Sequence, residues 1–167
     1  MDINSAIELA IQSEIEGREF YRMLAQQTSD RKARKVFMDL SADEDMHLVF
    51  LKRLSKTLQT KDLNLNELKL PSIRSFDDTE SPIFSRQFKE FVKNADLEIS
   101  ALSIGIKLEL EAVEFYKKMA NSTEDKRLKE LFEYLAEWEK SHYEALNSQL
   151  NFFKKYLATK TSFFRGF

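Results

Sequence analysis

The sequence predicts an all-α protein, a four-helix bundle built from two repeated helix pairs. Three observations indicate this fold. The chain has three glycines and two prolines in 167 residues, and so few of these residues favour long helices. Apolar residues recur with helical spacing over most of the chain. Residues 5–51 align without a gap with residues 100–146 and match at 16 of 47 positions, where a random identity on the order of 6% would give about three matches.

Four long helices are expected along the chain. The first covers residues 4–27, where apolar groups recur from Ile3 to Ala25 until the polar cluster QQTSD ends it. The second extends from about residue 31 to 58, the third from about 96 to 121, and the fourth ends at about 156. Residues 121–125 form the turn between the last two helices, with Ser122 or Thr123 as the expected N-cap.

The two helix pairs are joined by a long crossover, residues 60–95, whose segment 60–82 contains both prolines and no sustained period. Within it, residues 84–94 are expected to form a short amphipathic helix. A C-terminal tail, residues 158–167, ends in TSFFRGF. Its phenylalanines either cap the bundle or a dimer interface, or dock on a larger partner or membrane surface. The length and a hydrophobic content of 43% predict a single domain over residues 1–167.

Composition excludes several classes of function. The net charge is −2 with acids and bases interspersed, which leaves no basic face for nucleic acid. Without cysteine there is no disulfide, Cys-based zinc site or iron–sulfur cluster. No run of about 18 apolar residues could span a membrane, and the acidic N-terminal turns argue against a secretory signal. The sequence therefore predicts a soluble cytoplasmic protein.

Both histidines of the chain lie in Glu-x-x-His motifs, EDMH at residues 44–47 and EKSH at residues 139–142. The two motifs are related by the repeat, whose offset is 95 residues, and each lies on the core-facing row of its helix. Another repeated pair of glutamates lies on the core rows of the first and third helices. One layer of the bundle is therefore expected to contain six polar side chains: Glu14, Glu44, His47, Glu109, Glu139 and His142.

Such a layer predicts a dinuclear metal site. Buried, unpaired carboxylates cost several kcal/mol each, so they must be protonated, hydrated or bound to cations. Two divalent ions neutralise four carboxylates, and two imidazoles complete the ligand plan of di-iron and di-manganese bundles. Oxygen and nitrogen donors without thiolate suit iron or manganese, with zinc as an adventitious occupant. The alternative is a polar layer that fixes helix register without metal.

Several residues near these six are candidates for alternative or supporting members of the layer. Glu16 and Glu111 are alternative ligands. Each lies two residues after Glu14 or Glu109, however, and therefore points about 200° away from it around the helix. Glu19 and Glu114 are expected to be solvated. For Asp43 we favour an exposed position over one that orients a histidine. Packing is the expected role of Trp138.

Four segments of the chain resemble the rubrerythrin branch of the ferritin-like superfamily: EIEGREFY (14–21), VFMDLSADEDMH (36–47), ELEAVEFY (109–116) and LFEYLAEWEKSH (131–142). The resemblance covers about residues 3–157. It implies a ferritin-like bundle that binds two iron ions through the four carboxylates and two imidazoles named above. It also implies that Tyr21 and Tyr116, the candidate catalytic residues, hydrogen-bond to ligand carboxylates. Each follows its glutamate by seven residues, so the two side chains share a helix face.

The sequence departs from rubrerythrin proper in two ways. It lacks the cysteines of the rubredoxin domain, so electrons are expected from an external donor such as a rubredoxin. It has Ala112 where that protein carries an additional glutamate. The resemblance implies an oxidoreductase that reduces H2O2 or O2 in oxidative-stress defence, as a homodimer or higher homo-oligomer. A ferroxidase that handles iron and a metal-stabilised bundle that serves association are the alternatives.

Overall fold

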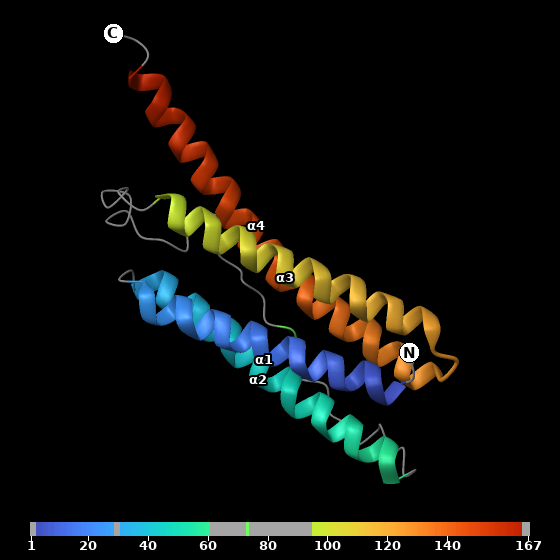
Figure 1. Cartoon of the computed structure of the whole chain (residues 1–167). Coiled ribbons are helices and arrows are strands. Elements are labelled where there is room, and N and C mark those ends of the chain that lie inside the picture. The colour runs from blue at the N-terminus through green and yellow to red at the C-terminus, as the bar shows by residue number, and fades with distance from the viewer. Residues whose placement is uncertain (1–2, 29–30, 61–72, 74–94, 165–167) are drawn as a thin grey trace.

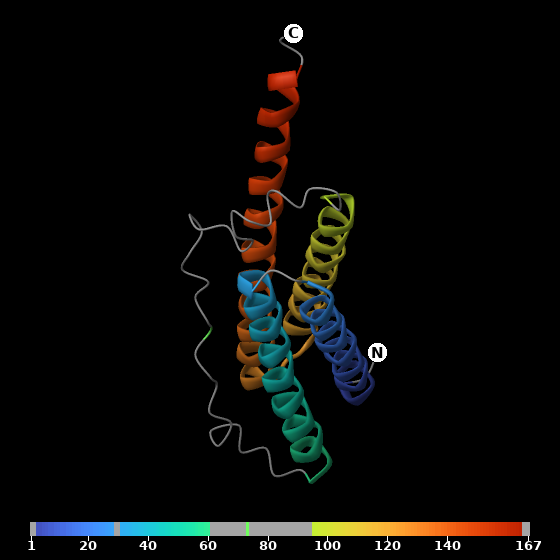
Figure 2. The same ribbon diagram turned by 90° about the vertical axis from the view of Figure 1, so that its left-hand side faces the viewer.

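The structure, a computed structural model, describes residues 3–28, 31–60, 73 and 95–164. Its four helices are α1 (Ile3–Gln27), α2 (Arg31–Thr60), α3 (Ala95–Ser122) and α4 (Lys126–Phe164). Helix α1 packs against α2 as one antiparallel pair, and α3 packs against α4 as the other (Figures 1 and 2). The predicted all-α four-helix bundle of ferritin-like type is thereby confirmed.

Helix α4 extends further than the sequence predicts. It continues to Phe164 rather than ending near residue 156, so the expected tail begins as a continuation of the helix. The last turns of α4 project beyond the other helices (Figure 1). The short helix expected at residues 84–94 lies outside the described residues, as does most of the crossover and the end of the tail.

The turn before α4 is capped by Asp125, so the prediction of Ser122 or Thr123 as N-cap is wrong. The Asp125 carboxylate accepts a hydrogen bond from the backbone N–H of Arg127 at 2.9 Å, as an N-cap side chain does. The Asp125 carbonyl accepts the first helical bond, from Lys129 at 2.9 Å. The Ser122 hydroxyl instead donates to the Met119 carbonyl within α3. Ser122 therefore belongs to the end of α3, and the turn is shorter than expected.

The core consists of two apolar clusters, with the six polar side chains between them along the bundle. One cluster contains Ala6, Ile7, Ala10, Phe50, Leu51, Leu54, Tyr116 and Phe132 among others. The other contains Tyr21, Leu24, Phe37, Leu40, Leu102, Leu146 and Leu150. Each fully buried large apolar side chain contributes about 1.5–3 kcal/mol. The two clusters therefore fix the helix positions on both sides of the polar layer.

Each helix keeps a polar face toward solvent. Exposed charged residues form ion pairs one helical turn apart, such as Lys129 with Glu133 at 3.9 Å. Such exposed pairs contribute at most about 1 kcal/mol each, so the core rather than the surface holds the bundle together. In the described ranges, no helix is long and apolar enough to cross a membrane.

Candidate metal centre

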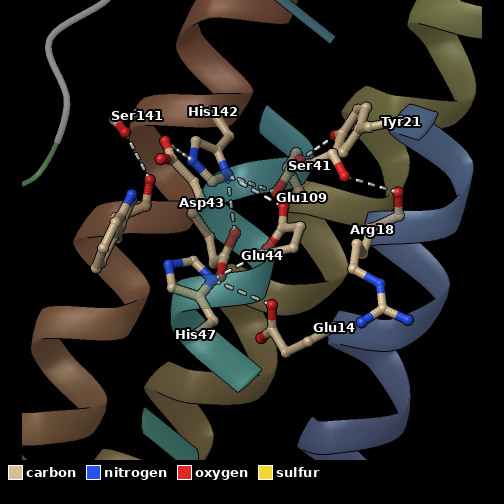
Figure 3. Close-up of polar contacts among 12 residues, drawn as sticks. Glu14, Arg18, Tyr21, Ser41, Asp43, Glu44, His47, Glu109, Ser141 and His142 are labelled. Atoms are coloured by element: carbon tan, nitrogen blue, oxygen red, sulfur yellow. Dashed lines mark hydrogen bonds and ion pairs between the residues drawn. The ribbon is translucent and has the colours of Figure 1, made fainter. Parts of the chain in front are cut away.

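Six polar side chains meet in the middle of the bundle, and Figure 3 labels all of them except Glu139. Helix α1 contributes Glu14 and α3 contributes Glu109, while α2 and α4 each contribute one Glu-x-x-His pair. All six are buried: both histidines are 0% exposed, and the most accessible carboxylate, Glu14, is 5% exposed. The structure thus brings together every residue for which the sequence predicts a place in this layer.

The local helix geometry explains how each motif presents two donors. A glutamate and a histidine three residues apart lie one above the other on the same helix face. In α2, Glu44 Oε2 lies 3.0 Å from His47 Nδ1. In α4, Glu139 Oε2 lies 3.2 Å from His142 Nδ1. Each pair therefore points its carboxylate and its ring nitrogen into the same space between the helices.

Three carboxylates surround the imidazole of His47. Its Nδ1 lies 3.1 Å from Glu14 Oε2, 3.0 Å from Glu44 Oε2 and 2.9 Å from Glu139 Oε1. These four residues form one group whose donor atoms all lie within 4.8 Å of one another. Three oxygens and one nitrogen at this separation could hold one metal ion.

The imidazole of His142 has a matching environment. Its Nδ1 lies 3.4 Å from Glu44 Oε1, 3.6 Å from Glu109 Oε2 and 3.2 Å from Glu139 Oε2. Together they form a second group with donor atoms within 4.8 Å. This group could also hold one metal ion.

Two residues, Glu44 and Glu139, belong to both groups. Each turns one carboxylate oxygen toward His47 and the other toward His142. Glu14 and Glu109 belong to one group each. This arrangement fits two divalent ions held by two shared and two terminal carboxylates, because four carboxylates balance the charge of two such ions. The donor set of oxygen and imidazole nitrogen suits iron or manganese.

The electrostatics of the layer show how the four carboxylates are tolerated together. Burial, reinforced by the charge of Glu139, raises the pKa of Glu14 well above its usual range. Burial also raises the pKa of Glu109 to about 8, against the opposing effect of His142. Glu139 behaves differently: burial disfavours its charge, but His47 and His142 outweigh burial and lower its pKa. The two terminal carboxyls therefore favour the protonated form, whereas the shared Glu139 favours the ionised form.

The two histidines also have shifted pKa values, which affect the charge of the layer. Burial would lower the pKa of His47, but the charges of Glu139 and Glu14 outweigh burial and raise it. For His142, Glu109 and the hydrogen bond to Asp43 raise the pKa against burial in the same way. Hydrogen bonds from both imidazoles lower the pKa of Glu44, although burial and Glu139 oppose this. The imidazoles thus favour the protonated form and the two shared carboxylates the ionised form, which lowers the net charge of the layer.

The two interior tyrosines each donate a hydrogen bond to a carboxylate on the other helix pair. The Tyr21 hydroxyl donates to Glu109, and the Tyr116 hydroxyl donates to Glu14. Both tyrosines are 1% exposed. Since each tyrosine contacts a carboxylate that belongs to only one donor group, it restrains the orientation of that terminal carboxylate.

The prediction that Asp43 is exposed is wrong. Asp43 is 0% exposed, and its Oδ2 lies 3.3 Å from His142 Nε2, the ring nitrogen opposite the donor group. Its repeat-related residue is Trp138, whose ring lies edge to face on His47 with centroids 4.3 Å apart. A signal for Asp43 is present in the sequence, because Leu40, Asp43 and His47 follow the core spacing of three and four residues.

The rival acidic residues lie outside the layer. Glu16, Glu19, Glu111 and Glu114 are exposed. Glu16 accepts a hydrogen bond from Gln12 at 2.8 Å, and Glu111 pairs with Lys107 at 3.5 Å. Glu16 and Glu111 also line the rim of a cavity of about 250 Å³ between α1 and α3. Sequence reasoning did not identify this cavity.

Comparisons with known proteins agree with the fold. A family model described as Rubrerythrin matches residues 5–150. A solved structure of a hypothetical protein from Pyrococcus furiosus superposes with a TM-score of 0.66, at 22% sequence identity, over 93% of this chain and 92% of that one. A comparison with curated proteins found no match.

Proposed function

Because this chain belongs to the rubrerythrin family of the ferritin-like superfamily, we propose that it is a di-iron carboxylate oxidoreductase that reduces H2O2 or O2. The observation that carries the proposal is the pair of donor groups that share Glu44 and Glu139. A layer needed only for helix register would not require two carboxylates that each face both imidazoles. Manganese or zinc are alternative occupants of the same donors.

The reaction balances as a two-electron reduction. Two iron ions bound in the layer would supply one electron each, so one H2O2 takes up two electrons and two protons and leaves as two water molecules. The protons come from solvent, and an external donor such as a rubredoxin returns the two electrons. The chain has no cysteine, so it contains no iron–sulfur or rubredoxin-type iron centre of its own.

The residues of the chain hold and shape the site. Glu44 and Glu139 link the two halves of the layer, while Glu14 and Glu109 complete one half each. Tyr21 and Tyr116 fix the terminal carboxylates by hydrogen bonds. All six donor residues are buried, and in such a site charge interactions are stronger than at the surface.

Rapid mixing of the anaerobic Fe(II)-loaded protein with each oxidant tests the function. We expect H2O2 to oxidise the loaded protein faster than O2, and turnover to continue when a reduced rubredoxin is supplied. Glu44→Gln should abolish both, because this variant removes the charge of a shared carboxylate. Glu19→Gln is the matched control, since the Glu19 side chain is 54% exposed, and it should react like the unchanged protein.

Other outcomes separate the alternatives. Fast oxidation by O2 with accumulation of mineralised iron would point to a ferroxidase, and storage would further require a closed shell, visible as a large particle in sedimentation. A loaded protein inert to both oxidants would contradict the proposal and favour a bundle that uses metal for stability alone.

A further inference from the structure

The two halves of the metal layer differ in how their histidines are held. His142 Nε2 lies 3.3 Å from Asp43 Oδ2, so this nitrogen donates to a buried carboxylate and leaves Nδ1 for the donor group. His47 Nε2 has no hydrogen-bond partner among the residues that the structure describes. Trp138 lies edge to face on the His47 ring instead. A carboxylate on the second ring nitrogen fixes the orientation of a metal-binding histidine and raises its basicity.

A cavity between two helices reaches the Glu14 and His47 half of the layer. It lies between α1 and α3, and its rim carries exposed side chains including Leu9, Ser13, Glu16 and Glu111. Its inner end is lined by Glu14 and Tyr116, the terminal carboxylate of the His47 half and the tyrosine bound to it. The cavity therefore connects solvent with the carboxylate of that half.

The repeat-related region beside Glu109 is packed. Gly105 corresponds to Ala10 of the cavity wall, and a Cβ placed on Gly105 would lie 3.1 Å from the Leu146 side chain and 3.5 Å from the Tyr21 hydroxyl. Leu108 stands where the cavity has Ser13. A methyl group next to Tyr21 would therefore require the Leu146 side chain to shift, whereas Tyr116 lines the cavity.

We propose that the cavity is the access route by which a divalent cation enters and leaves the Glu14 and His47 half of the layer. The metal in this half exchanges. The Glu109 and His142 half is closed and binds its metal more tightly, because Asp43 holds His142. The exposed acids at the rim, Glu16 and Glu111, favour a cation over an anion, and Glu14 at the inner end is one of the ligands that would receive it. This inference rests on the proposed function only in that both require a dinuclear metal site.

The first part of the test measures affinity in the metal-free protein with Co(II) alone, followed by its visible absorption. We expect two binding events of unequal affinity. Asp43→Asn should weaken the tighter event roughly 10-fold to 100-fold and leave the weaker one unchanged. Trp138→Phe is the matched control at the repeat-related position: it keeps an aromatic ring on His47, and it should change neither affinity by a comparable factor.

The second part measures the rate of Co(II) uptake and release. The double variant Ala112→Leu with Ser13→Leu fills the cavity. Leucine is chosen at position 13 because the repeat-related residue on the packed side is Leu108. We expect this variant to load and release the weaker Co(II) at least about 10-fold more slowly, with both affinities retained. Ile104→Trp adds bulk at an exposed position that does not line the cavity, and it should leave the rates unchanged.

The outcomes separate this inference from the proposed function. Two Co(II) ions that bind with equal affinity, or an Asp43→Asn variant that weakens both events equally, would overturn the assignment of one tight half and one exchangeable half. Unchanged rates in the filled variant would overturn the access route. Either result leaves the dinuclear site standing, whereas failure to bind two Co(II) ions would contradict the proposed function itself.

Discussion

Tyr116 of α3 donates a hydrogen bond to Glu14 of α1 across the interface between the two helix pairs. Tyr21 of α1 makes the reciprocal bond to Glu109 of α3. The two bonds cross in opposite directions and end on the two terminal carboxylates. They therefore couple the packing of the two helix pairs to the geometry of the metal layer, which leads to the first prediction.

Replacing either tyrosine with phenylalanine should slow oxidation of the Fe(II)-loaded protein without emptying the site. The phenyl ring keeps the packing, but a buried carboxylate loses its donor, which costs about 1–3 kcal/mol. Stopped-flow oxidation by H2O2 and an iron assay on the same sample measure the two effects. Tyr134→Phe is a control, since Tyr134 is half-buried and its ring packs against Trp138. Loss of iron in Tyr116→Phe would contradict a purely orienting role.

Asp125→Ala should lower the free energy of unfolding by about 1 kcal/mol, because it removes the N-cap of α4. Denaturant unfolding of the metal-free protein measures this change. Ser122→Ala is the matched control in the same turn, and it should have a smaller effect because the Ser122 hydroxyl bonds within α3. Equal effects of the two changes would show that Asp125 does not carry the cap.

The metal-free protein should lose stability as pH rises from about 5 through about 8. In the folded chain Glu109 keeps its proton up to a pKa of about 8, against a usual value of 4.5, and the pKa of Glu14 is raised as well. The folded chain then binds more protons than the unfolded chain, so the free energy of unfolding falls with rising pH. The raised pKa values of His47 and His142 act in the same direction above 6.5.

Denaturant unfolding at several pH values between about 5 and 8 measures this slope. Below about 4.5 the sign should reverse, because the pKa values of Glu44 and Glu139 are lowered in the folded chain and protonation of these carboxylates then costs stability. The double variant Glu14→Gln with Glu109→Gln should flatten the decline at higher pH. A stability that rises steadily from pH 5 to 8 would contradict the charge balance described for the layer.

Metal binding should release protons, up to about four per chain near neutral pH. Glu14, Glu109, His47 and His142 hold protons in the layer because their pKa values are raised, and metal ligands must give up their protons. Calorimetric titration in buffers of different ionisation enthalpy counts the protons released. Release of none would mean that none of these four groups holds a proton that the metal displaces.

Much of the fold and the site could be predicted from the sequence, because both depend on short-range spacing. Glu44 and His47 share a face by helical geometry alone, and the repeat supplies Glu139 and His142. The N-cap of α4 was not predicted correctly because Ser122, Thr123 and Asp125 are all good N-cap residues. Which of them caps α4 depends on where α3 ends, and α3 continues through Ser122. Asp43 was misplaced because its repeat-related residue, Trp138, is not acidic, so the repeat gave no second signal.

The cavity could not be predicted for a different reason. Its presence depends on how Ser13 and Ala112 pack across two helices distant in the sequence, and on the contrast with the packed region beside Gly105. Helical spacing tells which face a residue occupies, but it does not tell how closely two faces approach. The difference between the two halves of the layer therefore emerged only from the three-dimensional structure.

Anaerobic titration of the metal-free protein with Fe(II), with free and bound iron separated at each step, tests the central claim most directly. Two Fe(II) ions should bind per chain, and His47→Ala and His142→Ala should each weaken one of the two by roughly 10-fold or more. Glu19→Gln, on the exposed face, should still bind two. A stoichiometry of one iron per chain, or of none, would contradict the dinuclear site on which the proposed function depends.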